Sequence, residues 1–260
     1  MDLKDLAKAV SNIALQAGEE ILKVYAKEAD FQIEHKKDDS PLTKADQNAN
    51  QVICESLASL SVQYPIISEE NKQISYEIRK DYHRYWLVDP LDGTKEFIKR
   101  NGEFTVNIAL VENQKVILGV VYAPILEEMY WAVKGEGAYL MQGDEERRLH
   151  ANVFNQSDKG LKVVCSRSHL NEATQAIING LNEAEKVAKG SSLKFLIMAK
   201  GEAHIYPRLG PTMEWDTAAA QIILEEAGGQ VINEETKKPL TYNKENLLNP
   251  YFIAYGDLQQ

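Results

Sequence analysis

Apolar side chains recur at intervals of three and four residues at the start of the chain, which predicts two amphipathic helices. Thr43 is a suitable N-cap for the second helix, and a polar loop precedes it. A short apolar run follows and ends in Glu69 and Glu70, which indicates a buried strand with two carboxylates at its end. The segments expected here are a helix over residues 3–24, a loop over 36–41, a helix over 43–60 and a strand over 65–68.

Short strands dominate the middle of the chain, and strands alternate with helices after it. The middle part predicts an antiparallel meander, because polar or Pro/Gly turns separate its apolar runs. The later alternation predicts a smaller α/β half. We expect the boundary between Asn155 and Leu161, which gives an N-terminal α+β domain over residues 1–158 and a C-terminal α/β domain over 159–260. After a strand over 86–89, the meander strands are expected at 105–111, 116–122, 129–133 and 138–141. The later segments are expected at 162–165, 172–181, 193–199, 204–206, 217–227, 230–232 and 252–255.

The stretch from Trp86 to Phe97 holds the most informative residues of the chain. Its apolar start predicts a buried strand. Pro90 is expected to end this strand directly after Asp89, because a proline cannot continue a central strand. Asp92 follows in the turn. Two carboxylates are therefore expected where a buried strand ends and a turn begins.

The two residues after these carboxylates suit the binding of an anion. Gly93 lets the backbone approach a ligand closely, and Thr94 is a good N-cap for a short helix over residues 95–98. A helix start offers unpaired N–H groups to an anion such as phosphate. Carboxylates would repel that anion unless divalent cations lay between them, which predicts metal-assisted phosphoryl chemistry with Mg²⁺. The alternative is a turn whose aspartates only cap backbone amides.

Composition narrows the range of partners. The chain has 260 residues and a formal net charge of -10, which argues against a nucleic-acid polymer or an anionic membrane surface as partner. Cys54 and Cys165 lie in apolar runs far apart, as expected of free thiols in a reducing compartment. The first residues are charged and no apolar run is long enough to span a bilayer. We expect a cytoplasmic protein that binds a small molecule, with no transmembrane segment.

Further carboxylates lie at strand ends and helix starts, where side chains face a cleft. Together, Glu69, Asp89, Asp92 and Asp216 would supply enough negative charge for a two-metal site. Asp216 could equally serve only as the N-cap of the helix that follows it, and Asp46 could serve only the dipole of the second helix. The spacing does not prove that these residues converge in space.

These motifs resemble those of the lithium-sensitive, magnesium-dependent phosphatases of the inositol monophosphatase superfamily. The resemblance rests on residues 86–94, on the upstream Glu-Glu pair and on the downstream Trp-Asp helix start, and it covers essentially the whole chain. It implies a layered α/β/α/β/α sandwich of the inositol monophosphatase/fructose-1,6-bisphosphatase type, within the α+β and α/β classes. It also implies two or three Mg²⁺ ions, with metal ligands from Glu69, Asp89, the Leu91 carbonyl, Asp92 and Asp216.

The same resemblance implies roles in the reaction. Gly93 and Thr94 would hold phosphate through their backbone amides. The Thr94 hydroxyl and Asp46 would orient the attacking water, and Glu69 would help to activate it. Glu70 would lie just behind the metal ligands.

Several further segments are similar to the 3'(2'),5'-bisphosphate nucleotidase branch, which removes the 3'-phosphate of adenosine 3',5'-bisphosphate. These segments are 95–97, 103–110, 165–169, 190–194 and 206–208. A bisphosphate needs a second anion site, and Arg and Lys are the usual partners of phosphate. The resemblance implies substrate contacts from Glu69, Leu91, Asp92, Gly93, Thr94, His169, Ser191, Lys194, Arg208 and Asp216. It also leaves open a peripheral association with the inner face of a bacterial membrane, and it does not predict an oligomeric state.

Three other functions compete with this one. The first is that of another member of the same superfamily, which acts on inositol phosphates or fructose 1,6-bisphosphate. The second is a covalent phosphatase with an aspartate nucleophile, although the spacing Asp89-x-x-Asp92 is one residue too long for that motif. The third is a sensor that binds a nucleotide without turning it over.

Overall fold

The computed structural model describes residues 2–27, 31, 33–35, 41–166 and 171–259. The helices within these ranges are α1 (Leu3–Tyr25), α2 (Lys44–Ser59), α3 (Tyr76–Arg79), α4 (Thr94–Ile98), α5 (Glu172–Asn179), α6 (Leu193–Ala199) and α7 (Glu214–Glu226). Among the described residues, no helix has both the length and the apolar character that crossing a membrane requires.

The strands gather into two main sheets. A seven-stranded sheet has the order β3-β4-β5-β6-β7-β8-β9, and a five-stranded sheet has the order β12-β11-β13-β15-β14. The strands of the larger sheet are β3 (Ile66–Ser68), β4 (Arg84–Asp92), β5 (Thr105–Glu112), β6 (Lys115–Ala123), β7 (Glu128–Val133), β8 (Gly137–Gln142) and β9 (Glu145–Arg148). Those of the smaller sheet are β11 (Lys162–Ser166), β12 (Glu185–Lys189), β13 (Ile205–Arg208), β14 (Gln230–Asn233) and β15 (Phe252–Tyr255). The short pairs are β1 (Glu34–His35) with β2 (Pro41–Leu42), and β10 (Val153–Phe154) with β16 (Asp257–Leu258).

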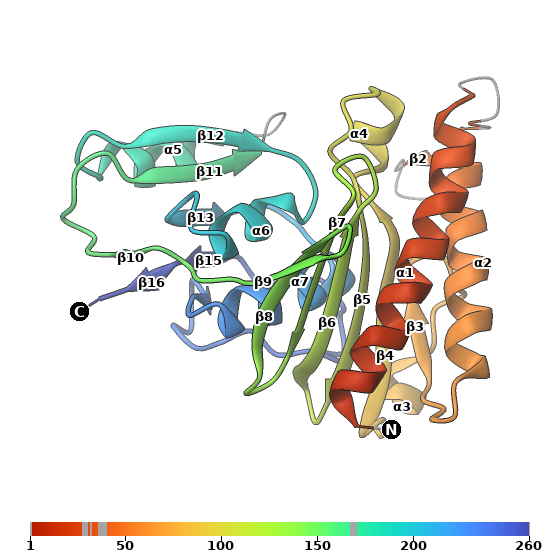
Figure 1. Cartoon of the computed structure of the whole chain (residues 1–260). Coiled ribbons are helices and arrows are strands. Elements are labelled where there is room, and N and C mark those ends of the chain that lie inside the picture. The colour runs from red at the N-terminus through yellow and green to blue at the C-terminus, as the bar shows by residue number, and fades with distance from the viewer. Residues whose placement is uncertain (1, 28–30, 32, 36–40, 167–170, 260) are drawn as a thin grey trace.

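Helices and sheets alternate in layers (Figure 1). Helices α1 and α2 cover one face of the seven-stranded sheet, and α7 packs on its other face. Helix α6 lies beside α7 and contacts the five-stranded sheet, and α5 covers the outside of that sheet. This order confirms the α/β/α/β/α arrangement expected from the sequence. The antiparallel pairing from β4 through β9 likewise confirms the meander.

The strand β5 is buried on both faces, and the two-residue period of a strand divides its side chains between two cores. Val106, Ile108 and Leu110 face the core under α1 and α2. Ala109 and Val111 belong to the second core, which α6 and α7 fill. The second core holds residues from both sides of position 158, and the division into domains at that point stays a prediction.

Three local expectations were wrong. Pro90 does not end β4, because a register shift between Asp89 and Asp92 takes the proline out of the hydrogen-bonded ladder and lets the strand continue to Asp92. Gly93, rather than Thr94, is the N-cap of α4, and it adopts a left-handed conformation that suits glycine. Asp216 lies at the third position of α7, and Met213 is the N-cap.

Candidate active site

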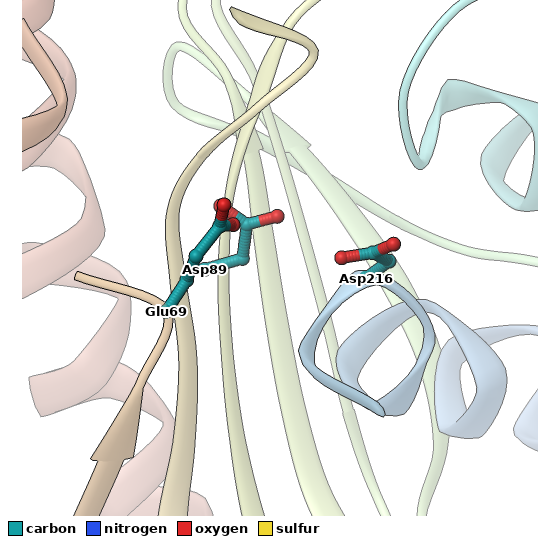
Figure 2. Close-up of side chains that lie close together, drawn as sticks. All are labelled: Glu69, Asp89 and Asp216. Carbon is teal, nitrogen blue, oxygen red and sulfur yellow. The ribbon is translucent and has the colours of Figure 1, made fainter. Parts of the chain in front are cut away.

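Three carboxylates from distant parts of the chain point toward one another (Figure 2). Glu69 follows β3, Asp89 lies in β4 just before the register shift, and Asp216 belongs to the first turn of α7. One oxygen of each lies within 4.8 Å of the others. The strands β3 and β4 are parallel neighbours, and α7 crosses the sheet beside them. Packing therefore produces the convergence that the spacing could not prove.

The electrostatics of this cluster favour a bound cation. Burial raises the pKa of Asp89, and the negative charges of Glu69 and Asp92 raise it further. Burial likewise raises the pKa of Asp216, and Asp92 and Glu69 add to the effect. A divalent cation among these oxygens would remove the repulsion, since hard oxygen ligands suit Mg²⁺. The donor set therefore fits the predicted metal.

Asp92 lies at the end of β4, near enough to this cluster for its charge to raise the pKa of Asp89 and Asp216. Residues of the C-terminal half hold it in place. Its Oδ2 atom accepts hydrogen bonds from the hydroxyls of Ser191 at 2.7 Å and Ser192 at 3.0 Å. The Ser192 hydroxyl also lies 3.0 Å from the backbone carbonyl of Asp216. These contacts join β4, the start of α6 and the start of α7. The Asp92 carboxylate is thus oriented by groups far away in the sequence.

The turn after Asp92 brings the backbone close to its neighbours. Gly93 has a φ of 94°, and a Cβ at this position would lie 2.9 Å from the carbonyl oxygen of Glu103 and 3.2 Å from the Cβ of Ser191. Any other residue at position 93 would therefore have a strained backbone, and its Cβ would lie too close to the Glu103 carbonyl oxygen.

Gly93→Ala is expected to destabilise the fold by about 2–3 kcal/mol, because strain and close contact add. Gly135→Ala is the matched control, because Gly135 has a φ of 81° and a Cβ added there would meet nothing within 4 Å. Urea unfolding of both variants measures the difference. Equal destabilisation by the two substitutions would show that the close approach at Gly93 costs nothing.

Thr94 links the turn to the second helix. Its hydroxyl lies 3.1 Å from Oδ1 of Asp46 and 3.3 Å from the Leu91 carbonyl. The other oxygen of Asp46 accepts hydrogen bonds from the backbone N–H and the hydroxyl of Thr43 in a capping box. The buried Asp46 therefore caps α2 together with Thr43, and it also contacts Thr94, the residue with which the resemblance pairs it in orienting the attacking water.

A pocket with cationic side chains opens beside the carboxylates. Its lining includes Asp92, Asp216, Lys194, Arg208 and the ring of Tyr206. Burial lowers the pKa of Lys194 to about 8, although nearby Asp92 opposes this effect. The Lys194 ammonium donates to the Ser191 carbonyl at 2.6 Å, and Arg208 donates to the Pro211 carbonyl at 2.8 Å. The Nε atom of Arg208 is buried and has no partner among the described residues.

The remaining predicted residues have different outcomes. Glu70 lies in the turn after β3, next to Glu69. The Leu91 carbonyl faces the Thr94 hydroxyl, as above. His169 lies outside the described residues. The sequence analysis assigned no individual role to Ser192, Thr105 or Asn107. Thr105 and Asn107 are polar residues in the mainly apolar first part of β5, and this pattern was the signal that could have identified them.

Comparisons with known proteins agree with this geometry. The model of the family described as "Inositol monophosphatase family" matches residues 2–253. The chain belongs to the inositol monophosphatase family. It is 44% identical over 248 residues to the 3'(2'),5'-bisphosphate nucleotidase CysQ of Salmonella typhimurium, covering 95% of this chain and 98% of the relative. The nucleotidase of the same name from Escherichia coli K12 is 44% identical over 244 residues, covering 94% and 96%.

Solved structures of this family share the fold. The crystal structure of CysQ from Bacteroides thetaiotaomicron superposes with a TM-score of 0.86 at 42% identity, covering 98% of each chain. The inositol monophosphatase of Thermotoga maritima superposes with a TM-score of 0.79 at 24% identity, covering 99% of this chain and 93% of that one. The fold is therefore that of the family throughout, and the sequence is more similar to the CysQ relatives than to this inositol monophosphatase.

Proposed function

We propose that this protein is a magnesium-dependent phosphatase that hydrolyses the 3'-phosphate of adenosine 3',5'-bisphosphate to give AMP and phosphate. The observation that carries the proposal is that Asp92 and Asp216 line the same pocket as Lys194 and Arg208. If a cation holds one phosphate of the substrate beside the carboxylates, the second phosphate can lie near Lys194 and Arg208 in the same pocket. The 44% identity to nucleotidases named for such a substrate supports the same reaction.

Two or three Mg²⁺ ions would be held by Glu69, Asp89, the Leu91 carbonyl, Asp92 and Asp216. When bound, they would lower the pKa of a coordinated water and neutralise charge on the phosphoryl oxygens. The backbone amides of Gly93 and Thr94 would hold the transferred phosphate. The cluster of Glu69, Asp89 and Asp216 supports these three ligands, and the other groups follow Asp89 directly along the chain, in the last residues of β4 and at the start of α4.

The attacking water would be oriented by Thr94. The Thr94 hydroxyl has one proton, and Asp46 is positioned to accept it at 3.1 Å. The oxygen of Thr94 is then left to accept a hydrogen bond from the water, and Glu69 accepts the one proton that the water loses on attack. The water oxygen forms a bond to phosphorus, the bond from phosphorus to the 3'-oxygen breaks, and solvent protonates the leaving oxygen.

Substrate preference tests the proposed function. Phosphate release at a fixed Mg²⁺ concentration is expected to be at least about tenfold faster from adenosine 3',5'-bisphosphate than from inositol 1-phosphate, because only the nucleotide has a second phosphate for Lys194 and Arg208. A preference for the inositol ester would overturn the choice of substrate. Loss of phosphate release on removal of Mg²⁺ with a chelator is the accompanying control.

We also propose a cytoplasmic location. Cys54 and Cys165 are free thiols, as is usual in a reducing compartment.

A further inference from the structure

Two polar side chains interrupt the apolar face that β5 presents to the second core. Thr105 and Asn107 are two residues apart, so they lie on the same face of the strand as Ala109 and Val111. Both polar side chains are buried, with exposed fractions of 0% and 1%. Buried polar groups cost stability unless they are hydrogen-bonded, so their partners indicate their purpose.

Their partners are the two serines that hold Asp92. The Thr105 hydroxyl lies 2.7 Å from the hydroxyl of Ser191, and the amide nitrogen of Asn107 donates to the hydroxyl of Ser192 at 2.9 Å. Thr105 also lies 2.9 Å from the amide oxygen of Asn107. The four side chains thus form a continuous buried network that ends at one oxygen of Asp92.

The protons in this network can be assigned from donor chemistry. Each hydroxyl has a single proton, and an ionised carboxylate is the strongest acceptor in the network. Ser191 therefore gives its proton to Asp92, and the single proton of Thr105 is shared between Ser191 and the amide oxygen of Asn107. The amide N–H of Asn107 occupies a lone pair of Ser192, which turns the proton of Ser192 away from β5, toward Asp92 or the backbone carbonyl of Asp216.

The backbone also supports this arrangement. Ser191 has a φ of 50°, a conformation that costs a residue other than glycine about 1 kcal/mol. The strained residue is therefore the same Ser191 whose hydroxyl donates to Asp92 at 2.7 Å. With Oδ2 bonded to both serines, Oδ1 of Asp92 has no hydrogen-bond partner within the described part of the chain.

We propose that Thr105 and Asn107 are positioning residues for the metal centre. They orient the hydroxyls of Ser191 and Ser192, these hydroxyls hold Oδ2 of Asp92, and Oδ1 is thereby presented to the cation. The proposal rests on one part of the proposed function, that Asp92 is a metal ligand. It does not depend on which phosphate ester is the substrate.

Thr105→Val tests the proposal, because it removes the hydroxyl and nearly preserves the shape of the side chain. Calorimetric titration of the full chain, stripped of metal, with Mg²⁺ is expected to show a Kd about fivefold higher for this variant, the effect of losing one hydrogen bond. The KM for the nucleotide at saturating Mg²⁺ is expected to stay unchanged. Thr105→Ser, which restores a hydroxyl, is expected to bind Mg²⁺ as the unmodified chain does.

A double-mutant cycle tests whether Thr105 acts through Ser191. The pair Thr105→Val and Ser191→Ala is expected to bind Mg²⁺ no more weakly than Ser191→Ala alone, because both substitutions break one chain of contacts. Asn107→Leu provides a second route if Thr105→Val does not fold, and it is also expected to raise the Kd. An unchanged Kd for Mg²⁺ in a folded variant would overturn the proposal. So would a double variant whose increase in Kd equals the product of the increases in the two single variants.

Calorimetry also separates this proposal from the proposed function. A chain that binds Mg²⁺ but does not hydrolyse the bisphosphate would refute the proposed substrate and still report the effect of Thr105→Val. Normal hydrolysis with a Kd that is insensitive to Thr105 and Asn107 would refute only the positioning role.

Discussion

Asp89→Asn is expected to lower kcat/KM for the bisphosphate nucleotide by about 10³-fold, the largest effect of any single substitution considered. Asp89 belongs to the carboxylate cluster with Glu69 and Asp216, and the amide would remove one negative charge and weaken a metal ligand. Steady-state phosphate release at saturating Mg²⁺ measures the loss. Activity within tenfold of the unmodified chain would contradict the assignment of Asp89 as a ligand.

The same substitution is expected to leave the metal-free fold as stable as before, or to stabilise it. Burial and nearby carboxylates raise the pKa of Asp89, so its ionised form is disfavoured in the folded state at neutral pH. Asparagine removes that penalty and can keep the oxygen that accepts the Leu91 N–H at 3.1 Å. Thermal unfolding with and without Mg²⁺ measures this, and the stabilisation by Mg²⁺ should shrink in the variant.

Asp144→Asn is the matched control for both measurements. Asp144 is exposed in the turn between β8 and β9, away from the carboxylate cluster, and the chemical change is identical. Its activity and its response to Mg²⁺ are expected to match those of the unmodified chain. A parallel fall in both variants would point to a general effect of charge.

Arg208→Ala is expected to raise the KM for the bisphosphate nucleotide by about 10–100-fold and to spare a simple ester such as inositol 1-phosphate. The guanidinium lines the pocket beside Asp92 and Asp216, and its buried Nε has no partner among the described residues. An anion that bonds this group gains charge-assisted hydrogen bonds, which are stronger than neutral ones. Steady-state kinetics with both substrates measures the difference.

The exposed Arg147 on β9 provides the control for charge, and Arg147→Ala is expected to change neither KM. Arg208→Lys keeps the positive charge but not the planar fork of donors, so an intermediate KM is expected. Equal losses on the nucleotide and the simple ester would remove Arg208 from the recognition of the second phosphate. Such a result would indicate a structural role through its bond to the Pro211 carbonyl.

Local pattern explains why much of the fold could be predicted. The helical period of α1, the capping box that Thr43 forms with Asp46, and the apolar runs of the meander all depend on neighbours close in the sequence. The errors arose where a tertiary contact changed a local preference. Pro90 stays within β4 only because the pairing of β4 with β5 shifts around it.

The sequence by itself determined which residues could bind a metal and a phosphate, since carboxylates and a glycine at a tight turn are chemical types that can be identified without coordinates. Only the tertiary structure decided that Asp216 reaches Glu69 and Asp89, because α7 packs across a sheet formed by a much earlier part of the chain. The hydrogen bonds from Ser191 and Ser192 to Asp92 likewise depend on the packing of segments that are far apart in the sequence. Contacts of this kind depend on how two sheets and a helix pack together, and neither the period of a strand nor that of a helix contains this information.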